Sequence, residues 1–273
     1  GRFRGEGVSL NDETSDDDLV FTTSSEGSLK QRDPHDLMCV RSHDVRLYSD
    51  VTAVLVASNC GKLVTGHDDG SLRVWDVVSG DDAAVRTAHE NAVSCLCEIS
   101  TVSLPGRVAR RSSRRDETVL TDTLFLSGGF DGRLVTWRVR DGNEPPERKR
   151  AWRAHDGVVL AVDWCAVSNL LVSGGEDRKY KVWDPHGRLL FSCAERDHAV
   201  TAVAWSPSGA HFAAGAFNCV WLCDAAGWCR ETTSNTSLGS TLSLAWSDDG
   251  RNLAGACAKA PGVFVGTVLD DRR

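Results

Sequence analysis

The chain has 273 residues, a hydrophobic fraction of 41% and a formal net charge of −7. This length allows one large all-β domain, and the negative charge argues against non-specific binding to nucleic acid. No apolar run approaches the roughly 18 residues that a membrane-spanning helix needs, so no membrane insertion is expected. The ten cysteines lack paired zinc-finger spacing, so we expect reduced structural thiols and no metal site or cofactor.

The first stretch of the chain, residues 1–18, is rich in glycine and then acidic. Its composition predicts a disordered acidic segment, and an acidic binding tail is the alternative. Residues 19–29, LVFTTSSEGSL, have the pattern of a strand, a turn and the start of another strand. They predict a partial copy of the units that follow.

Five longer units follow, each with short β-branched and aliphatic runs separated by turn residues. Their approximate ranges are 51–88, 89–140, 153–194, 198–232 and 240–268, and residues 270–273 form a tail. The best-defined stretch, residues 153–184, reads RAHDGVVLAVDWCAVSNLLVSGGEDRKYKVWD. Short apolar runs bounded by glycine and other turn residues predict antiparallel strands.

The spacing of the tryptophans sets the period of these units. Trp164, Trp205 and Trp246 end equivalent first strands and follow one another at intervals of 41 residues. A period of about 40–45 residues, with Trp-Asp ending the third strand, is typical of WD repeats. The sequence therefore predicts an all-β WD-repeat β-propeller over residues 19–269. We expect about five full four-stranded blades plus a partial one, as an incomplete seven-bladed ring with an exposed edge.

Four polar residue types recur at corresponding places and predict an internal hydrogen-bond network. Two sets are complete and a third lacks a histidine at the expected place: His89, Ser127, Asp131 and Trp137; His155, Ser173, Asp177 and Trp183; and Thr65, Asp69 and Trp75. A buried indole N–H needs an acceptor, and a neutral imidazole accepts at one nitrogen and donates at the other. A catalytic triad is the alternative, but the serine lies inside a strand and the set is repeated, whereas an active site is usually built once. In unit 198–232 the set is degraded to Ala214, Asn218 and Cys223.

Unit 89–140 carries a basic insertion at about residues 100–121. Its possible partner-contact residues are Arg110, Arg111, Arg114 and Arg115. A solvated loop is one interpretation. The other is a contact with an acidic partner, switched by phosphorylation of Ser112 or Ser113.

Two further features concern connections and turns. Residues 141–150, with two adjacent prolines, predict a polar connector. Six residues near the blade turns are expected to be exposed, as partner contacts or as ordinary surface: His67, Phe130, Arg178, Lys179, Phe217 and Trp228.

Departures from the repeat consensus carry a resemblance to a known family. The pieces AHDGVVLAVDW, EDRKYKVWD, LCDAAGW and AWSDDGRNLAGAC follow one another from residue 154 onward. They resemble the first propeller of the eighty-kilodalton WD-repeat subunits of intraflagellar transport complex B. The resemblance covers residues 151–269 and, more weakly, 19–90; it fails across the basic insertion and the acidic start.

This resemblance implies a non-enzymatic protein-interaction scaffold that acts in assembly of the cilium or flagellum. It implies other complex B subunits as protein partners, and a location in the cilium or flagellum and the basal body region, on the cytoplasmic side. The alternative is a WD-repeat adaptor or substrate receptor of another cytosolic or nuclear complex. An enzyme with a small-molecule substrate is disfavoured, because the sequence has no Gly-rich phosphate loop, HExxH motif or nucleophile elbow.

Overall fold

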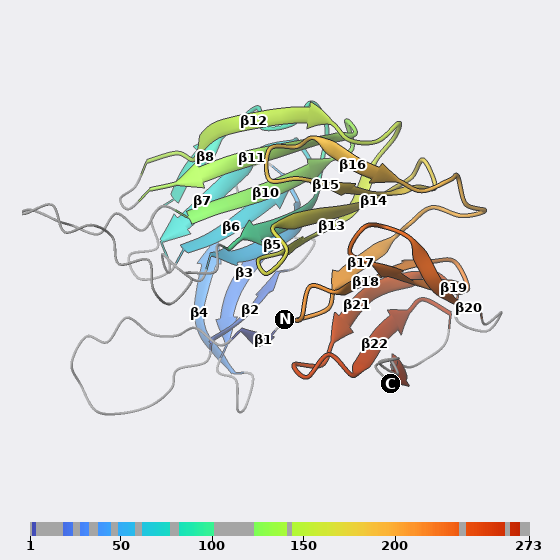
Figure 1. Cartoon of the computed structure of the whole chain (residues 1–273). Helices are drawn as coiled ribbons and strands as arrows, with labels where there is room; N and C mark the ends of the chain where they lie inside the picture. Colours follow the sequence, from blue (N-terminus) through green and yellow to red (C-terminus); the bar gives the residue numbers. More distant parts are fainter. Residues whose placement is uncertain are drawn as a thin grey trace, which may run out of the picture.

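The computed structural model describes residues 2–3, 19–23, 28–32, 38–44, 49–57, 62–76, 82–100, 123–140, 144–234, 239–259 and 263–267. Their strands form six antiparallel sheets, five with four strands and one with three, and the sheets radiate as blades from a common centre (Figure 1). The all-β propeller predicted from the sequence is confirmed. In the part of the chain that the structure describes, no helix is long and apolar enough to cross a membrane.

The blades are numbered here in chain order. Blade 1 contains β1 (Arg2–Phe3), β2 (Leu19–Thr23), β3 (Ser28–Arg32) and β4 (Cys39–Asp44). Blade 2 contains β5 (Val51–Ala57), β6 (Lys62–His67), β7 (Leu72–Asp76) and β8 (Asp82–Val85). Blade 3 contains β9 (Val93–Ile99), β10 (Thr123–Gly129), β11 (Arg133–Val139) and β12 (Glu147–Arg153).

The second half of the chain builds the other three blades. Blade 4 contains β13 (Val159–Cys165), β14 (Leu170–Gly175), β15 (Tyr180–Trp183) and β16 (Leu189–Ser192). Blade 5 contains β17 (Ala202–Trp205), β18 (His211–Ala216), β19 (Cys219–Asp224) and β20 (Cys229–Ser234). Blade 6 contains β21 (Thr241–Trp246), β22 (Asn252–Cys257) and β23 (Val263–Thr267).

The first strands of successive blades lie side by side around the centre. From blade 2 onward, β5 packs against β9, β9 against β13, β13 against β17 and β17 against β21 (Figure 1). The second strands are covered on both faces, so β6 is buried at every position and β14 at nearly every one. Outer strands such as β12 and β20 are mostly exposed. Continuous apolar runs therefore mark the second strands, while the outer strands are polar.

The core lies between neighbouring blades and is not shared in one central cluster. Between blades 2 and 3, Val64 and Val74 pack with Val93, Phe125 and Trp137. Similar clusters join blades 3 and 4, blades 4 and 5, and blades 5 and 6. Blades 3, 4 and 5 are thus each held by the blade on either side, as expected of a stacked repeat.

The stretch 19–29, predicted as the remnant of a blade, lies in the four-stranded blade 1. In the last unit the structure describes three strands. Strand β1 lies in the stretch predicted to be disordered, and its Arg2 and Phe3 pair with Val20 and Leu19. Two residues cannot show strand periodicity, so composition misled the prediction there. Residues 4–18 and the tail 270–273 lie outside the described residues.

The prediction of a polar connector at 141–150 is wrong for its second part, which is a strand. Residues 147–153 form β12, the fourth strand of blade 3, paired with β11 in antiparallel register. Its sequence ERKRAWR lacks an apolar run because an outer edge strand has little surface to bury. Blade 3 therefore extends beyond the predicted unit 89–140.

Candidate functional site

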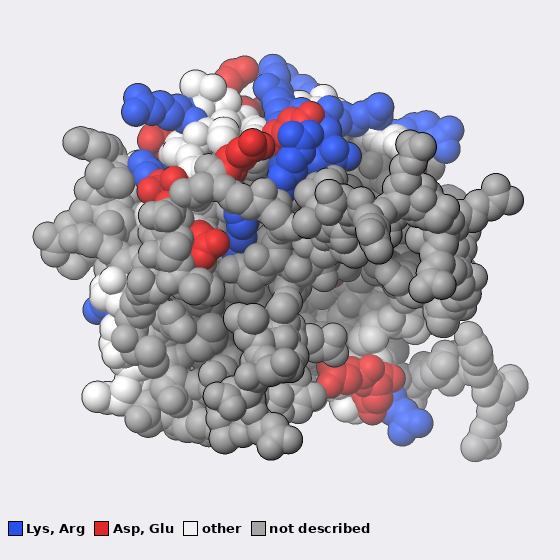
Figure 2. Space-filling view, turned by 90° about the vertical axis from the view of Figure 1, so that its left-hand side faces the viewer, with Lys and Arg blue, Asp and Glu red and all other residues white. Residues whose placement is uncertain are grey.

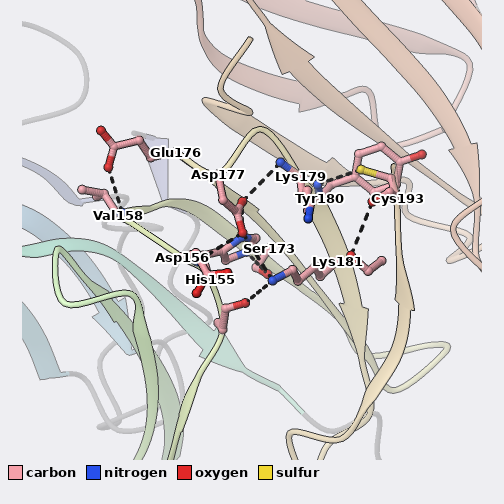
Figure 3. A network of polar contacts seen from close by, with 12 residues as sticks. His155, Asp156, Val158, Ser173, Glu176, Asp177, Lys179, Tyr180, Lys181 and Cys193 are labelled. Carbon is pink, nitrogen blue, oxygen red and sulfur yellow. Dashed lines mark hydrogen bonds and ion pairs between the residues drawn. The ribbon is translucent and has the colours of Figure 1, made fainter. Parts of the chain in front are cut away.

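The polar set of blade 4 comes together between the lead-in to β13 and the turn after β14 (Figure 3). His155 Nε2 lies 2.7 Å from Ser173 Oγ, and His155 Nδ1 lies 2.7 Å from Asp177 Oδ1. The Trp183 indole N–H donates to the same Ser173 oxygen at 2.9 Å. Because the Asp177 carboxylate can only accept, His155 donates to it from Nδ1, and in the neutral imidazole Nε2 then accepts the Ser173 proton.

Asp177 closes this network at the turn. Its carboxylate accepts the backbone N–H groups of Lys179 at 3.2 Å and Asp156 at 3.3 Å, and it pairs with Lys181 Nζ at 3.3 Å. Burial opposes ionisation, but the bond from His155 and these donors hold the pKa of Asp177 well below its ordinary value. The turn between β14 and β15 is therefore fixed to the entry of β13.

Blade 3 has the same arrangement. His89 Nε2 lies 2.7 Å from Ser127 Oγ, and His89 Nδ1 lies 3.0 Å from Asp131 Oδ1. The Trp137 indole N–H donates to Ser127 at 2.8 Å. Burial lowers the pKa of His89, and the neutral ring is the form that accepts the serine proton.

Blade 2 has a histidine that the sequence analysis missed. His67 Nε2 lies 3.0 Å from Thr65 Oγ1, to which the Trp75 indole N–H also donates at 3.0 Å. Asp69 instead accepts the backbone N–H of Ser71 at 2.9 Å. His67 was expected to be exposed near a turn, but it is fully buried. Its position two residues after Thr65 on one strand places both side chains on the same face, which is the signal that could have found it.

Blade 5 replaces the histidine by an arginine. Arg196 precedes Trp205 by nine residues, as His155 precedes Trp164. Its backbone N–H donates to Arg178 O, just as those of His89 and His155 donate to the corresponding turn residues of the preceding blades. The guanidinium lies 5.1 Å from the Trp221 ring centroid and its Nη2 donates to the Tyr180 hydroxyl at 3.3 Å. Blade 5 has Ala214 and Cys223 in place of Ser and Trp, and its Arg196 makes a cation–π contact where the other blades have the hydrogen-bonded histidine.

The serine–histidine–aspartate sets have the geometry of structural hydrogen-bond networks. Ser127 and Ser173 are fully buried, and each hydroxyl is held by an indole N–H and an imidazole. A substrate could not reach either oxygen without breaking the blade. Among the described residues, no group of three potential ligands is placed to bind a metal ion. Burial also raises the pKa of the Cys95 and Cys223 thiols to about 12, which keeps them protonated.

A row of basic side chains follows the outer edge of blade 3; we call it the basic strip. It consists of Arg133, Arg140, Arg148, Lys149, Arg150 and Arg153 on and beside β11 and β12. Figure 2 shows Lys and Arg gathered along the top of that face, with fewer acidic side chains among them. Arg133 lies directly opposite Arg153 in the ladder, and each pairs with a carboxylate, Arg133 with Glu90 and Arg153 with Asp156, both at 3.3 Å.

The other residues predicted near turns differ in exposure. Phe130, Arg178, Phe217 and Trp228 are exposed, and Lys179 is half-buried. The four insertion arginines Arg110, Arg111, Arg114 and Arg115 lie outside the described residues.

Comparison with known families agrees with the repeat pattern. Residues 37–76, 146–184 and 187–221 match the model of the WD domain, G-beta repeat. The segment 146–184 runs from β12 to β15, so a sequence repeat starts on the outer strand of one blade and ends on the third strand of the next. With its blades and these repeats, the chain has the fold of a WD-repeat β-propeller.

Two curated relatives show where the closer similarities lie. The chain is 44% identical over 125 residues to the Intraflagellar transport protein 80 homolog of Rattus norvegicus, covering 46% of this chain and 16% of that protein. It is 27% identical over 158 residues to Cilia- and flagella-associated protein 52 of Mus musculus, covering 49% of this chain and 25% of that protein. The chain thus matches a quarter or less of the length of these relatives.

The fold itself is found in a solved structure. A chain of the crystal structure of the Mitotic Checkpoint Complex superposes with a TM-score of 0.75, covering 98% of this chain and 80% of that one. The sequences are only 18% identical, so this similarity concerns the fold alone.

Proposed function

We propose that this propeller is a non-enzymatic protein-interaction scaffold of an intraflagellar transport complex B, acting in cilium or flagellum assembly. The observation that carries the proposal is the 44% identity to the Intraflagellar transport protein 80 homolog over nearly half of the chain. A second ciliary relative, Cilia- and flagella-associated protein 52, supports the same location. The partners are then other complex B subunits, met in the cilium and basal body region on the cytoplasmic side.

The geometry supports a scaffold role. The polar sets are buried within the blades, where they keep turns and strands in fixed positions. Exposed aromatic and arginine side chains stand at the rims and outer strands, where a partner can reach them. A rigid frame that presents such residues lowers the ordering cost of binding.

Affinity purification of the tagged full-length protein from flagellated cells, followed by mass spectrometry, tests this proposal. Recovery of the complex B subunits above an untagged control is the expected outcome. Recovery of ubiquitin-ligase or chromatin components without complex B would instead favour a WD-repeat adaptor or substrate receptor with the same fold. In that case the ciliary assignment would be abandoned.

The basic insertion is proposed as a second contact, with an acidic partner. Replacing Arg107, Arg110, Arg111, Arg114 and Arg115 by alanine removes five positive charges. The proposal expects the loss of at least one protein that the unchanged chain recovers. Unchanged recovery of every partner would leave the insertion a solvated loop.

A further inference from the structure

The turn between β19 and β20 is fixed to the neighbouring blade. Gly227 has φ +104°, and a Cβ there would meet Phe191 Cδ1 of β16 at 2.3 Å. The carbonyl of Gly227 accepts the Tyr180 hydroxyl of β15 at 3.1 Å. Only glycine allows the backbone to approach the ring this closely in this conformation. The position of this turn is therefore set by blade 4 as well as by blade 5.

This turn holds a tryptophan at the surface. The backbone N–H of Trp228 donates to Asp224 Oδ1 at 2.9 Å, and its ring meets Phe191 edge to face at 5.3 Å between centroids. The side chain is nevertheless 63% exposed. Leu189 and Leu190 of β16 are exposed as well. Such a large apolar side chain would gain free energy from burial in a complex.

An exposed arginine follows each of the two turns, the one before β16 and the one before β20. Arg188 pairs with Asp184 at 3.2 Å, and Arg230 pairs with Asp224 at 2.6 Å. The arginine side chains are 77% and 64% exposed, whereas those of Asp184 and Asp224 are only 15% and 18% exposed. Both carboxylates also accept backbone N–H groups within their turns. The guanidinium groups thus face solvent while the carboxylates serve the turns.

The surface continues toward the basic strip of blade 3. A Cβ on Gly187, in the turn before Arg188, would meet the Trp152 ring of β12 at 2.8 Å. Arg150 donates to the carbonyl of His186 in the same turn. The outer edges of blades 3 and 4 are therefore in contact here.

We propose that Trp228 and the residues around it bind an acidic amphipathic segment of a partner protein. The site consists of Trp228 and Arg230 on blade 5 and of Arg188, Leu189, Leu190 and Phe191 on blade 4, and the contact between the Trp228 and Phe191 rings joins the two blades. We call these six residues the Trp228 patch. An exposed tryptophan with arginines nearby is the composition typical of binding hot spots. The two exposed guanidinium groups select carboxylates next to the apolar anchor. Only the identity of the partner as a complex B subunit rests on the proposed function.

The first test compares Trp228→Ala with Val265→Ala in the full-length protein purified from flagellated cells. Val265 is an exposed apolar residue on β23 of another blade and serves as the control. We expect Trp228→Ala to reduce recovery of at least one partner by about tenfold or more, as truncation of a hot spot does. Val265→Ala should recover all partners. Equal recovery by the two variants would overturn the proposal.

The second test asks whether the bound segment is acidic. Arg188→Lys and Arg230→Lys keep the charge and introduce amines that a carbodiimide couples directly to nearby carboxylates. The expected products join positions 188 or 230 to Asp or Glu of a partner, beside an apolar residue. Coupling only within the chain, while the partners are still recovered, would contradict the proposal.

The outcomes of these tests also distinguish the proposal of the Trp228 patch from the proposal of a ciliary function. Coupling to a protein outside complex B would support the patch and overturn the ciliary function. Coupling only between two copies of this chain would make the surface a self-association site and overturn the patch as a partner site. Loss of the partner on addition of anionic lipid vesicles, with no protein coupling, would assign the surface to a membrane and overturn it as well.

Discussion

His67 and Thr65 lie two residues apart on β6, and His67 Nε2 is 3.0 Å from Thr65 Oγ1. In blades 3 and 4 the corresponding histidine comes from the lead-in to the first strand, so blade 2 satisfies its hydroxyl and indole from within the second strand. We predict that His67→Ala destabilises the protein by about 1–3 kcal/mol, because the buried hydroxyl loses its acceptor. Urea unfolding followed by tryptophan fluorescence measures this difference.

His186 provides the matched control, because it is an exposed histidine in a turn. His186→Ala should change the free energy of unfolding by less than about 0.5 kcal/mol. Equal effects of the two substitutions would mean that the His67 contact does not contribute.

The sequence predicts those features of the fold and the site that repeat from blade to blade, and it misses those that occur once. The tryptophan period and the sets at His89 and His155 are repeated, so they could be recognised without coordinates. His67 and Arg196 were missed because neither is the residue that the repeat predicts at its place, although the two-residue spacing from Thr65 and the nine-residue spacing to Trp205 mark them in the sequence. Strand β12 was missed because its outward position leaves no apolar pattern to detect. The Trp228 patch joins residues of two blades, and only the fold brings them together.

Trp183 and His155 share the Ser173 hydroxyl, so their substitutions should not be additive. We expect Trp183→Ala to cost about 3–5 kcal/mol and His155→Ala about 1–3 kcal/mol. The double variant should lose less than the sum by about 0.5–3 kcal/mol, because either change already breaks the network. As a control, His155→Ala is combined with Thr65→Val, which lies in blade 2. The changes in the free energy of unfolding of these two substitutions should be additive. Simple additivity of the first pair would show that the network is not formed.

The buried histidines predict a decline in stability at acidic pH. Burial lowers the pKa of His67 and of His89 below 6.5. As the pH falls below 6.5 the unfolded chain takes up protons at these positions and the folded chain does not, so the free energy of unfolding decreases. His67→Gln removes one titrating group, and its stability should fall less between pH 7.5 and 5.5 than that of the unchanged protein. Parallel curves would contradict the assignment.

The Asp163 carboxyl should change the free energy of unfolding with pH in the opposite direction to the buried histidines. Its carboxylate joins blades 4 and 5 by accepting the backbone N–H groups of Trp164 at 2.9 Å and Trp205 at 2.6 Å. Burial raises the pKa of Asp163 to about 6. The folded state then holds a proton that the unfolded state releases near pH 4, so this group loses stability as the pH rises from about 4 to 6. The stability of Asp163→Asn relative to the unchanged protein should therefore increase over that range; a constant difference would argue against the raised pKa.

Gly227 links the fold to the proposed partner surface. An alanine there would meet Phe191 and would have to adopt a positive φ, so we expect Gly227→Ala to cost about 1–3 kcal/mol. Gly266→Ala on β23 is the matched control, because a Cβ at that position meets nothing within 4 Å and should be tolerated. Since the clash displaces the turn that holds Trp228, Gly227→Ala should also lower partner recovery as Trp228→Ala does, at a temperature where the variant is still folded. A folded Gly227→Ala protein with full recovery would show that the fixed position of this turn does not matter for binding.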